Sequence, residues 1–332
     1  MPIHIHIQFP KPRRRLGGPS RLFHRFSYDG HHLTYSIVAR DPQTRELGVA
    51  VQSHYFQVGP TVPWAISGVG AVATQSRVDV RYGPLGLELM RAGYGVDQAL
   101  AALLASDPEP EVRQVAMVDA EGRVAVHTGR SCIAQAGHRT GSGYSVQANL
   151  MLRDTVWDIM AGAFEGTSGP LAERMLAALD AAEAEGGDIR GKQSAAMLVV
   201  AGTPTGRSWE DRLIDLRVED HGEPLMELRR LLRLKRAYQS LREADLAAQR
   251  GDSKAAALLR ANALQLGPDL PELRFWVALG MATAGDMEQS VPLLREVMKS
   301  DSRWMETMRR LPASGRLSGD LLDELQRRLR AA

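Results

Sequence analysis

Residues 31–54 have the sequence HHLTYSIVARDPQTRELGVAVQSH, and this stretch constrains the fold more than any other part of the chain. Two apolar or alternating segments, TYSIVARD and ELGVAVQSH, flank the turn-like DPQTRE. This pattern predicts an antiparallel hairpin, because so short a connection cannot return a strand in the parallel direction. It also raises a functional question, since Thr34 stands at the start of the first strand.

Short strand and helix patterns alternate as far as residue 223. A second hairpin is predicted in VRQVAMVDAEGRVAVHTG, and helices are predicted in GPLGLELMRAGYGVDQALAALLASD and SGPLAERMLAALDAAEAEGG. Strand patterns return in QSAAMLVVAG and RLIDLRVEDH. Two sets of strands with helices between and after them predict an α+β domain over residues 34–223, with two stacked sheets and helices outside.

Pro224 marks a change of pattern, because the chain from there to residue 332 is helical in character and rich in Leu, Ala and Arg. Gly-Asp pairs recur at Gly251 and Gly285, an offset of 34 residues. This offset is the period of tetratricopeptide helix pairs. We therefore expect residues 224–332 to form a tetratricopeptide-like helical domain with a modest surface for a protein partner or for a second copy of the chain.

Composition narrows the classes of function. A net charge of +2 gives no general attraction to nucleic acid or membranes. The single cysteine, Cys132, excludes an internal disulfide, so we expect a cytoplasmic protein. No spacing of His, Cys or acidic residues indicates a metal site, and no glycine-rich loop matches a phosphate-binding motif. We expect no cofactor.

The first 33 residues differ from the rest, with six basic residues against one acidic residue. They lack the apolar centre of a secretion signal. We expect either a disordered basic arm or translated sequence upstream of the true start.

Seven stretches follow one another along residues 34–221: TYSIVARDPQTRELGVAVQS, VGPTVPWAISGVGAVATQS, RYGPLGLELMRAG, RQVAMVDAEGRVAVHTG, AGHRTGSGYSVQANL, GKQSAAMLVV and DLRVEDH. Through these stretches, the segment from Thr34 to about residue 232 closely resembles a bacterial family of unknown function, the one numbered 1028. The resemblance implies the four-layer αββα sandwich of the N-terminal nucleophile hydrolases. Members typically begin at or one residue before the position of Thr34, so this chain carries an added segment.

Thr34 is the nucleophile that the resemblance implies. In N-terminal nucleophile hydrolases the base is the α-amine of the same residue, whose ordinary pKa of about 7.7–8.0 leaves a neutral fraction near neutral pH. This amine exists only if the Leu33–Thr34 bond is cleaved, or if translation begins at position 33 and the first residue is then removed. The alternative, an ordinary strand threonine, stays open.

Other polar residues are candidates for the same site. Ser36 shares a strand face with Thr34, and Asn149 in VQANLM is a candidate oxyanion donor. The substrate-binding candidates stand near strand ends or on one face of a late strand: Ser53, Thr74, Gln75, Lys192, Asp215 and Arg217. Lys192 would lower the pKa of a nearby amine, and Arg217 would bind a substrate carboxylate or pair structurally with Asp215.

These features predict an amidohydrolase that cleaves a small amide or ureide-type substrate through Thr34. One alternative is a non-catalytic binding module on the same fold. Another is a scaffold whose helical repeats recruit a protein partner. We also expect a homo-oligomer.

Overall fold

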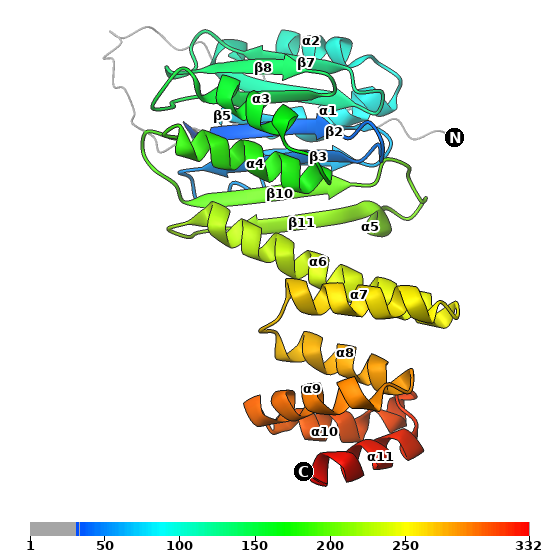
Figure 1. The fold of residues 1–332 in the computed structure, drawn as a ribbon. Coiled ribbons are helices and arrows are strands. Elements are labelled where there is room, and N and C mark those ends of the chain that lie inside the picture. Colours follow the sequence, from blue (N-terminus) through cyan, green and yellow to red (C-terminus); the bar gives the residue numbers. More distant parts are fainter. Residues whose placement is uncertain (1–30, 33, 332) are drawn as a thin grey trace, which may run out of the picture.

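The computed structural model describes residues 31–32 and 34–331, which form two antiparallel sheets, flanking helices and a helical C-terminal part (Figure 1). The expectation of an α+β chain with antiparallel sheets and a helical C-terminal region is confirmed. The predicted basic arm lies outside the described residues, apart from His31–His32.

Sheet A has the strand order β1-β5-β6-β7, with β4 paired to β5. Its strands are β1 (His31–His32), β4 (Pro63–Ile66), β5 (Gly70–Arg77), β6 (Arg113–Asp119) and β7 (Val124–Thr128). Helices α1 (Tyr82–Arg91) and α2 (Val96–Ser106) pack on its outer face through Leu87 and Leu100. They are separate helices because Gly93, with φ of 94°, takes the left-handed conformation that ends the first.

Sheet B has the strand order β11-β10-β3-β2-β9-β8. Its strands are β2 (Thr34–Arg40), β3 (Leu47–Ser53), β8 (Gly137–Gly141), β9 (Tyr144–Ala148), β10 (Ser194–Val200) and β11 (Arg212–Val218). Helices α3 (Val156–Gly166) and α4 (Leu171–Ala184) cover its outer face, where Met160 and Met175 belong to the same buried apolar cluster as Ile37. The short α5 (Ser208–Asp211) leads into β11.

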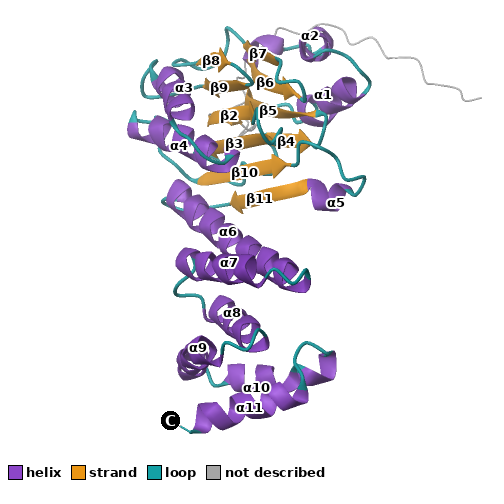
Figure 2. Ribbon diagram, turned by 45° about the vertical axis from the view of Figure 1, so that its right-hand side comes forward, coloured by secondary structure: helices purple, strands orange, loops and turns teal. Residues whose placement is uncertain are grey.

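The inner faces of the two sheets pack against each other, and helices lie on both outer sides (Figure 2). The core between the sheets combines Val38 and Val51 of sheet B with Ala73 and Ala116 of sheet A. Side chains alternate along a strand. Thr34, in phase with Val38 on β2, therefore points into the space between the sheets.

Helix α6 (Pro224–Gln249) begins at the predicted domain boundary, with proline at its first position. Its first turns nevertheless belong to the core of the preceding domain, because Leu225, Leu228 and Leu232 pack in the cluster on the outer face of sheet B. The predicted division at residue 224 therefore separates residues that the structure packs into one core.

The remaining helices form the C-terminal part: α7 (Ser253–Leu266), α8 (Pro271–Thr283), α9 (Met287–Ser300), α10 (Arg303–Arg310) and α11 (Gly319–Arg330). The repeated Gly-Asp pairs occupy matching positions. Gly251 and Gly285 have φ of 80° and 88°, and Asp252 and Asp286 accept hydrogen bonds from the first turns of α7 and α9. The tetratricopeptide interpretation stays a prediction. In the described part of the chain, no helix has the length and apolar character that crossing a membrane requires.

Candidate active site between the sheets

A cluster of polar side chains is buried between the sheets, at one end of the apolar inter-sheet core. Its members are all fully buried: Thr34, Ser36, Ser53, Gln75, Gln114, Gln147 and Asn149. They lie at the ends of strands β2, β3, β5, β6 and β9 that meet on this side. Burying four carboxamides is costly unless hydrogen bonds satisfy them, so their partners define the site.

Thr34 lies opposite Ser53 in the β2–β3 pairing. Its hydroxyl Oγ1 donates to Ser53 Oγ at 3.0 Å. Its carbonyl oxygen accepts from the backbone nitrogen of Asn149 at 3.1 Å and from Gln75 Nε2 at 3.1 Å. Partners from both sheets therefore fix the orientation of Thr34.

Gln114 joins the two sheets at the centre of the cluster. Its Oε1 accepts from Gln75 Nε2 at 2.7 Å and from Asn149 Nδ2 at 2.8 Å. Its Nε2 lies 2.9 Å from both Thr128 Oγ1 and the carbonyl oxygen of Ala148. Gln114 thus uses both ends of its amide to connect β6 of sheet A with β9 of sheet B.

Ser36 connects the cluster farther along β2. Its hydroxyl donates to Gln75 Oε1 at 2.5 Å and accepts from Gln147 Nε2 at 2.6 Å. Ser145 in turn donates to Gln147 Oε1 at 2.9 Å. The predicted residues Thr34, Ser36 and Gln75 are therefore in one hydrogen-bonded network.

The sequence interpretation missed Gln114 and Gln147. For Gln114 a signal was present in the two-residue repeat of the strand. Gln114 lies two and four residues before the apolar Ala116 and Val118, so the three side chains share one strand face. A carboxamide in phase with a buried apolar face indicates an internal polar network rather than a surface position.

Asn149 lies beside Thr34, as the oxyanion hypothesis requires, but its Nδ2 is engaged. That nitrogen is 2.8 Å from Gln114 Oε1 and 3.4 Å from the Thr34 carbonyl oxygen. Its Oδ1 is buried and has no hydrogen-bond partner among the described residues. The atom of Asn149 that is left for a ligand is therefore an acceptor.

Two residues with left-handed backbone conformations flank the cluster. Ser76, with φ of 69°, follows Gln75, and Leu150, with φ of 54°, follows Asn149. This conformation costs a non-glycine residue about 1–3 kcal/mol, and such strain is found mainly at functional sites. The strain therefore supports a functional interpretation of this end of the sheets.

Thr74 and Lys192 lie apart from the cluster. Thr74 points to the opposite face of β5 from Gln75, and its hydroxyl donates to the carbonyl oxygen of Asp79 at 3.1 Å. Lys192 Nζ is 2.6 Å from a carboxylate oxygen of Glu223 and 3.5 Å from one of Glu183. The hydrogen bond to Glu223 raises the pKa of Lys192, so these two acidic groups hold it as a cation.

The predicted pair of Asp215 and Arg217 is present on β11, with Arg217 Nε 3.1 Å from Asp215 Oδ1. Asp215 also pairs with Arg212 at 2.9 Å. However, β11 is the edge strand, three strands from β2, which is about 14 Å at the usual spacing of about 4.8 Å. This pair does not join the polar cluster.

The described residues contain no group of three or more His, Cys, Asp or Glu side chains placed to hold a metal ion. The Cys132 thiol donates to the carbonyl oxygen of Arg113 at 3.3 Å, and burial raises the pKa of this thiol. A raised pKa disfavours the reactive thiolate form.

The fold and the cluster define a mixed α+β protein with two facing antiparallel sheets and a buried, amide-rich site at one end. The model of a family described as "Family of unknown function (DUF1028)" matches residues 34–228, and the chain belongs to that family. The crystal structure of protein SPO2555 from Silicibacter pomeroyi, described with the same family, is similar to this chain. The sequence identity is 30%, the TM-score is 0.55, and the match covers 60% of this chain and 84% of that chain. The comparison with curated proteins gives no match.

Proposed function

We propose that this protein is an amidohydrolase in which Thr34 becomes the N-terminal nucleophile for a small amide or ureide-type substrate. The observation that carries the proposal is the place of Thr34, which opens β2 inside the polar cluster with its hydroxyl 3.0 Å from Ser53 Oγ. The layer order, helices outside two facing antiparallel sheets, also supports it, since the N-terminal nucleophile hydrolases have that order.

The proposed reaction needs the free α-amine of Thr34. The amine takes the hydroxyl proton while Oγ1 forms a bond to the substrate carbonyl carbon. The carbon–nitrogen bond then breaks, and the departing amine receives the proton. Water, deprotonated by the same α-amine, hydrolyses the acyl ester and restores Thr34. The Thr34 hydroxyl, which donates to Ser53 Oγ in this structure, turns its hydrogen to the amine before the attack.

In this proposal Asn149 is a hydrogen-bond acceptor rather than the oxyanion donor that its sequence position suggested. Because its Nδ2 already contacts protein acceptors, its unpartnered Oδ1 is suited to accept from an N–H group, such as the free α-amine. Backbone N–H groups near the cluster then stabilise the oxyanion. Strand β1 pairs with Ser76 and Arg77 of β5, so His31–His32 lie at the same end of the sheets as Gln75. Access for a substrate requires this segment to leave.

The test is intact-mass measurement of protein made from the native gene, before and after treatment with a small β-lactone. This electrophile opens on a nucleophile and adds its whole mass as an ester. We expect a chain that begins at Thr34 and gains one adduct there. Thr34→Ala should gain none, and Thr34→Ser should retain part of the labelling.

Thr74→Ala is the matched control, because Thr74 is as buried as Thr34 and also donates one hydrogen bond, outside the cluster. Each alanine variant should cost about 1 kcal/mol of stability, but only Thr34→Ala should abolish labelling. Full labelling of a chain that still carries residues 1–33 would exclude the proposed mechanism.

The complete burial of Thr34 and its satisfied hydroxyl favour a second candidate function, a non-catalytic binding or scaffold protein. In that case the helical part carries the function. Leu258 on α7 and Leu246 on α6 are 73% and 45% exposed, and in this candidate they contact a protein partner or a second copy of the chain. An unprocessed, unlabelled chain whose self-association is lost in Leu258→Glu would favour this candidate.

A further inference from the structure

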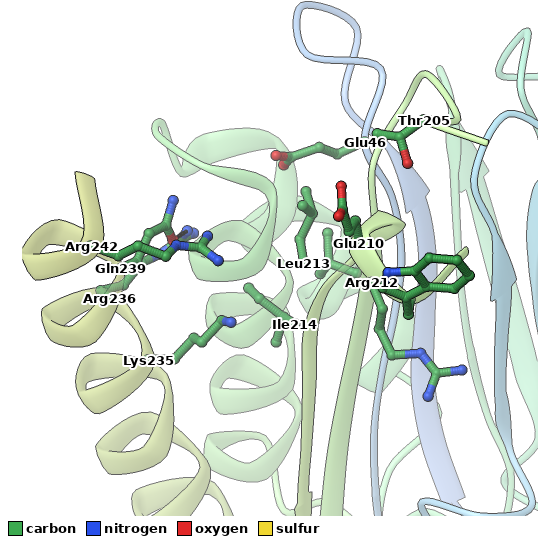
Figure 3. A pocket seen from close by; sticks show the side chains of 12 residues that line it. Glu46, Thr205, Glu210, Arg212, Leu213, Ile214, Lys235, Arg236, Gln239 and Arg242 are labelled. Carbon is green, nitrogen blue, oxygen red and sulfur yellow. Dashed lines mark hydrogen bonds between the residues drawn. The ribbon is translucent and has the colours of Figure 1, made fainter. Parts of the chain in front are cut away.

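A second site lies away from the Thr34 cluster, between the edge of sheet B and helix α6. It is a pocket of about 550 Å³, within the range of about 300–1,000 Å³ typical of small-molecule sites. Val199 and Ile214 line its sheet side, and α6 contributes mainly charged side chains. Figure 3 shows Lys235, Arg236 and Arg242 extending from α6 toward β11.

The lining includes four cationic and two acidic side chains. Some of these groups are paired: Arg236 with Glu173, Arg212 with Asp215, and Glu210 with Arg207. After these pairs are set aside, Lys235, Arg242 and Glu46 have no ion-pair partner within the described residues. The pocket therefore holds two uncompensated cations and one uncompensated carboxylate.

Lys235 and Arg242 lie seven residues apart, which places them on one face of α6 two turns from each other. The pKa of Lys235 is lowered mainly by desolvation, and further by the positive charges of the nearby Arg242 and Arg236. Placing cations together in a partly buried pocket costs free energy that a bound anion would recover. The arrangement therefore favours an anionic ligand on the α6 side.

Glu46 faces the pocket from the turn that precedes β3. Desolvation raises its pKa, although Arg236 opposes this effect. A carboxylate without an ion-pair partner is an acceptor for ligand hydroxyl or amino groups. Trp209 also lines the pocket, and this residue is 75% exposed, so a flat indole surface is open to a ligand ring.

We propose that this pocket binds a sugar phosphate, either free or as part of a nucleotide. The phosphoryl group lies against Lys235 and Arg242, and the sugar hydroxyl groups donate to Glu46. A phosphate monoester carries about −1.5 to −2 charges near pH 7, which Lys235 and Arg242 offset, while Glu46 brings the net charge of the unpaired lining groups to +1. If the ligand is a nucleotide, its base stacks on Trp209.

Isothermal titration of the full-length protein with AMP, ribose 5-phosphate and succinate tests this inference. AMP or ribose 5-phosphate should bind saturably, and succinate should bind at least about tenfold more weakly. Lys235→Ala and Arg242→Ala should each weaken phosphate binding by about tenfold, since a hydrogen bond to a charged group is typically worth that much. Lys254→Ala, an exposed lysine on α7, is the control and should bind as wild type does.

The two sources of the phosphate are distinguished by Trp209→Ala. A nucleotide site loses affinity for AMP in this variant but keeps its affinity for ribose 5-phosphate, whereas a free sugar phosphate site binds both as before. The inference is overturned if neither phosphate binds, if succinate binds as tightly as the phosphates, or if the double variant of Lys235 and Arg242 binds like wild type.

Discussion

Replacing Gln114 with leucine tests whether the polar cluster holds the two sheets together. Leucine keeps most of the side-chain volume but removes the whole amide. The amide accepts from Gln75 and Asn149 and donates toward β7, β8 and β9. Because every partner is buried or part-buried, water cannot take the place of the amide without reorganising the sheets.

The size of the effect follows from the hydrogen bonds that the substitution removes. Gln75 Nε2 and Asn149 Nδ2 each keep the Thr34 carbonyl oxygen as a second acceptor, so they do not become wholly unsatisfied. With a net value of about 1 kcal/mol for each hydrogen bond, Gln114→Leu should destabilise the protein by roughly 3–5 kcal/mol.

Urea unfolding of the full-length chain, compared with Gln265→Leu, measures this effect. Gln265 is exposed on α7, so its replacement should change stability by no more than about 0.5 kcal/mol. For Gln114→Leu, the urea concentration at the midpoint of unfolding should fall, and the dependence of the unfolding free energy on urea concentration should stay the same. A loss below about 1 kcal/mol for Gln114→Leu would show that the cluster contributes little to sheet association, contrary to the reasoning above.

Two further predictions concern charge and helix capping. The hydrogen bond from Arg113 lowers the pKa of Asp107 to about 2, below its ordinary value of about 3.9. The contribution of the Asp107–Arg113 ion pair to the stability of the fold is therefore complete above pH 4 and is lost as the pH falls toward 2. In urea unfolding, Asp107→Asn should be less stable than wild type at pH 7, and the difference should shrink toward pH 2; a constant difference would contradict the assignment. Asp252 accepts from the backbone nitrogen of Ala255 at 2.9 Å, so Asp252→Ala should cost about 1 kcal/mol. The exposed Asp269→Ala should cost nearly nothing in the same assay, and equal losses would refute the cap.

Periodicity was sufficient to predict the β2–β3 and β6–β7 hairpins and the helical character of the chain after Pro224. The alternation in residues 34–53 gives the β2–β3 hairpin, whose register pairs Thr34 with Ser53. Once these strands are known, the common face of Thr34 and Ser36 follows from the two-residue repeat. The helical character after Pro224 is likewise a local property, since apolar spacing and proline position both act within a few turns.

The composition of the site could not be predicted in the same way, because it depends on which strands of the two sheets face each other. Gln75 meets Thr34 only because β5 of sheet A lies across from β2 of sheet B. Asp215 and Arg217 show the converse. Their pairing follows from their spacing, but their distance from Thr34 depends on the order β11-β10-β3-β2, which no local pattern specifies.

The polar cluster fixes the position of Thr34 through hydrogen bonds. Of its three polar groups, the hydroxyl is bonded to Ser53 and the carbonyl oxygen to Gln75 and Asn149. Cleavage of the preceding bond would change the third group, the nitrogen, from an amide to a basic amine, to which the hydroxyl would then turn its hydrogen from Ser53. A strand threonine with no further role would need only one partner for its hydroxyl, without four buried carboxamides or the strained backbone at Ser76 and Leu150. The reaction proposed above would use this arrangement, because it needs the nitrogen and the hydroxyl of Thr34 to keep a fixed geometry while their protons move.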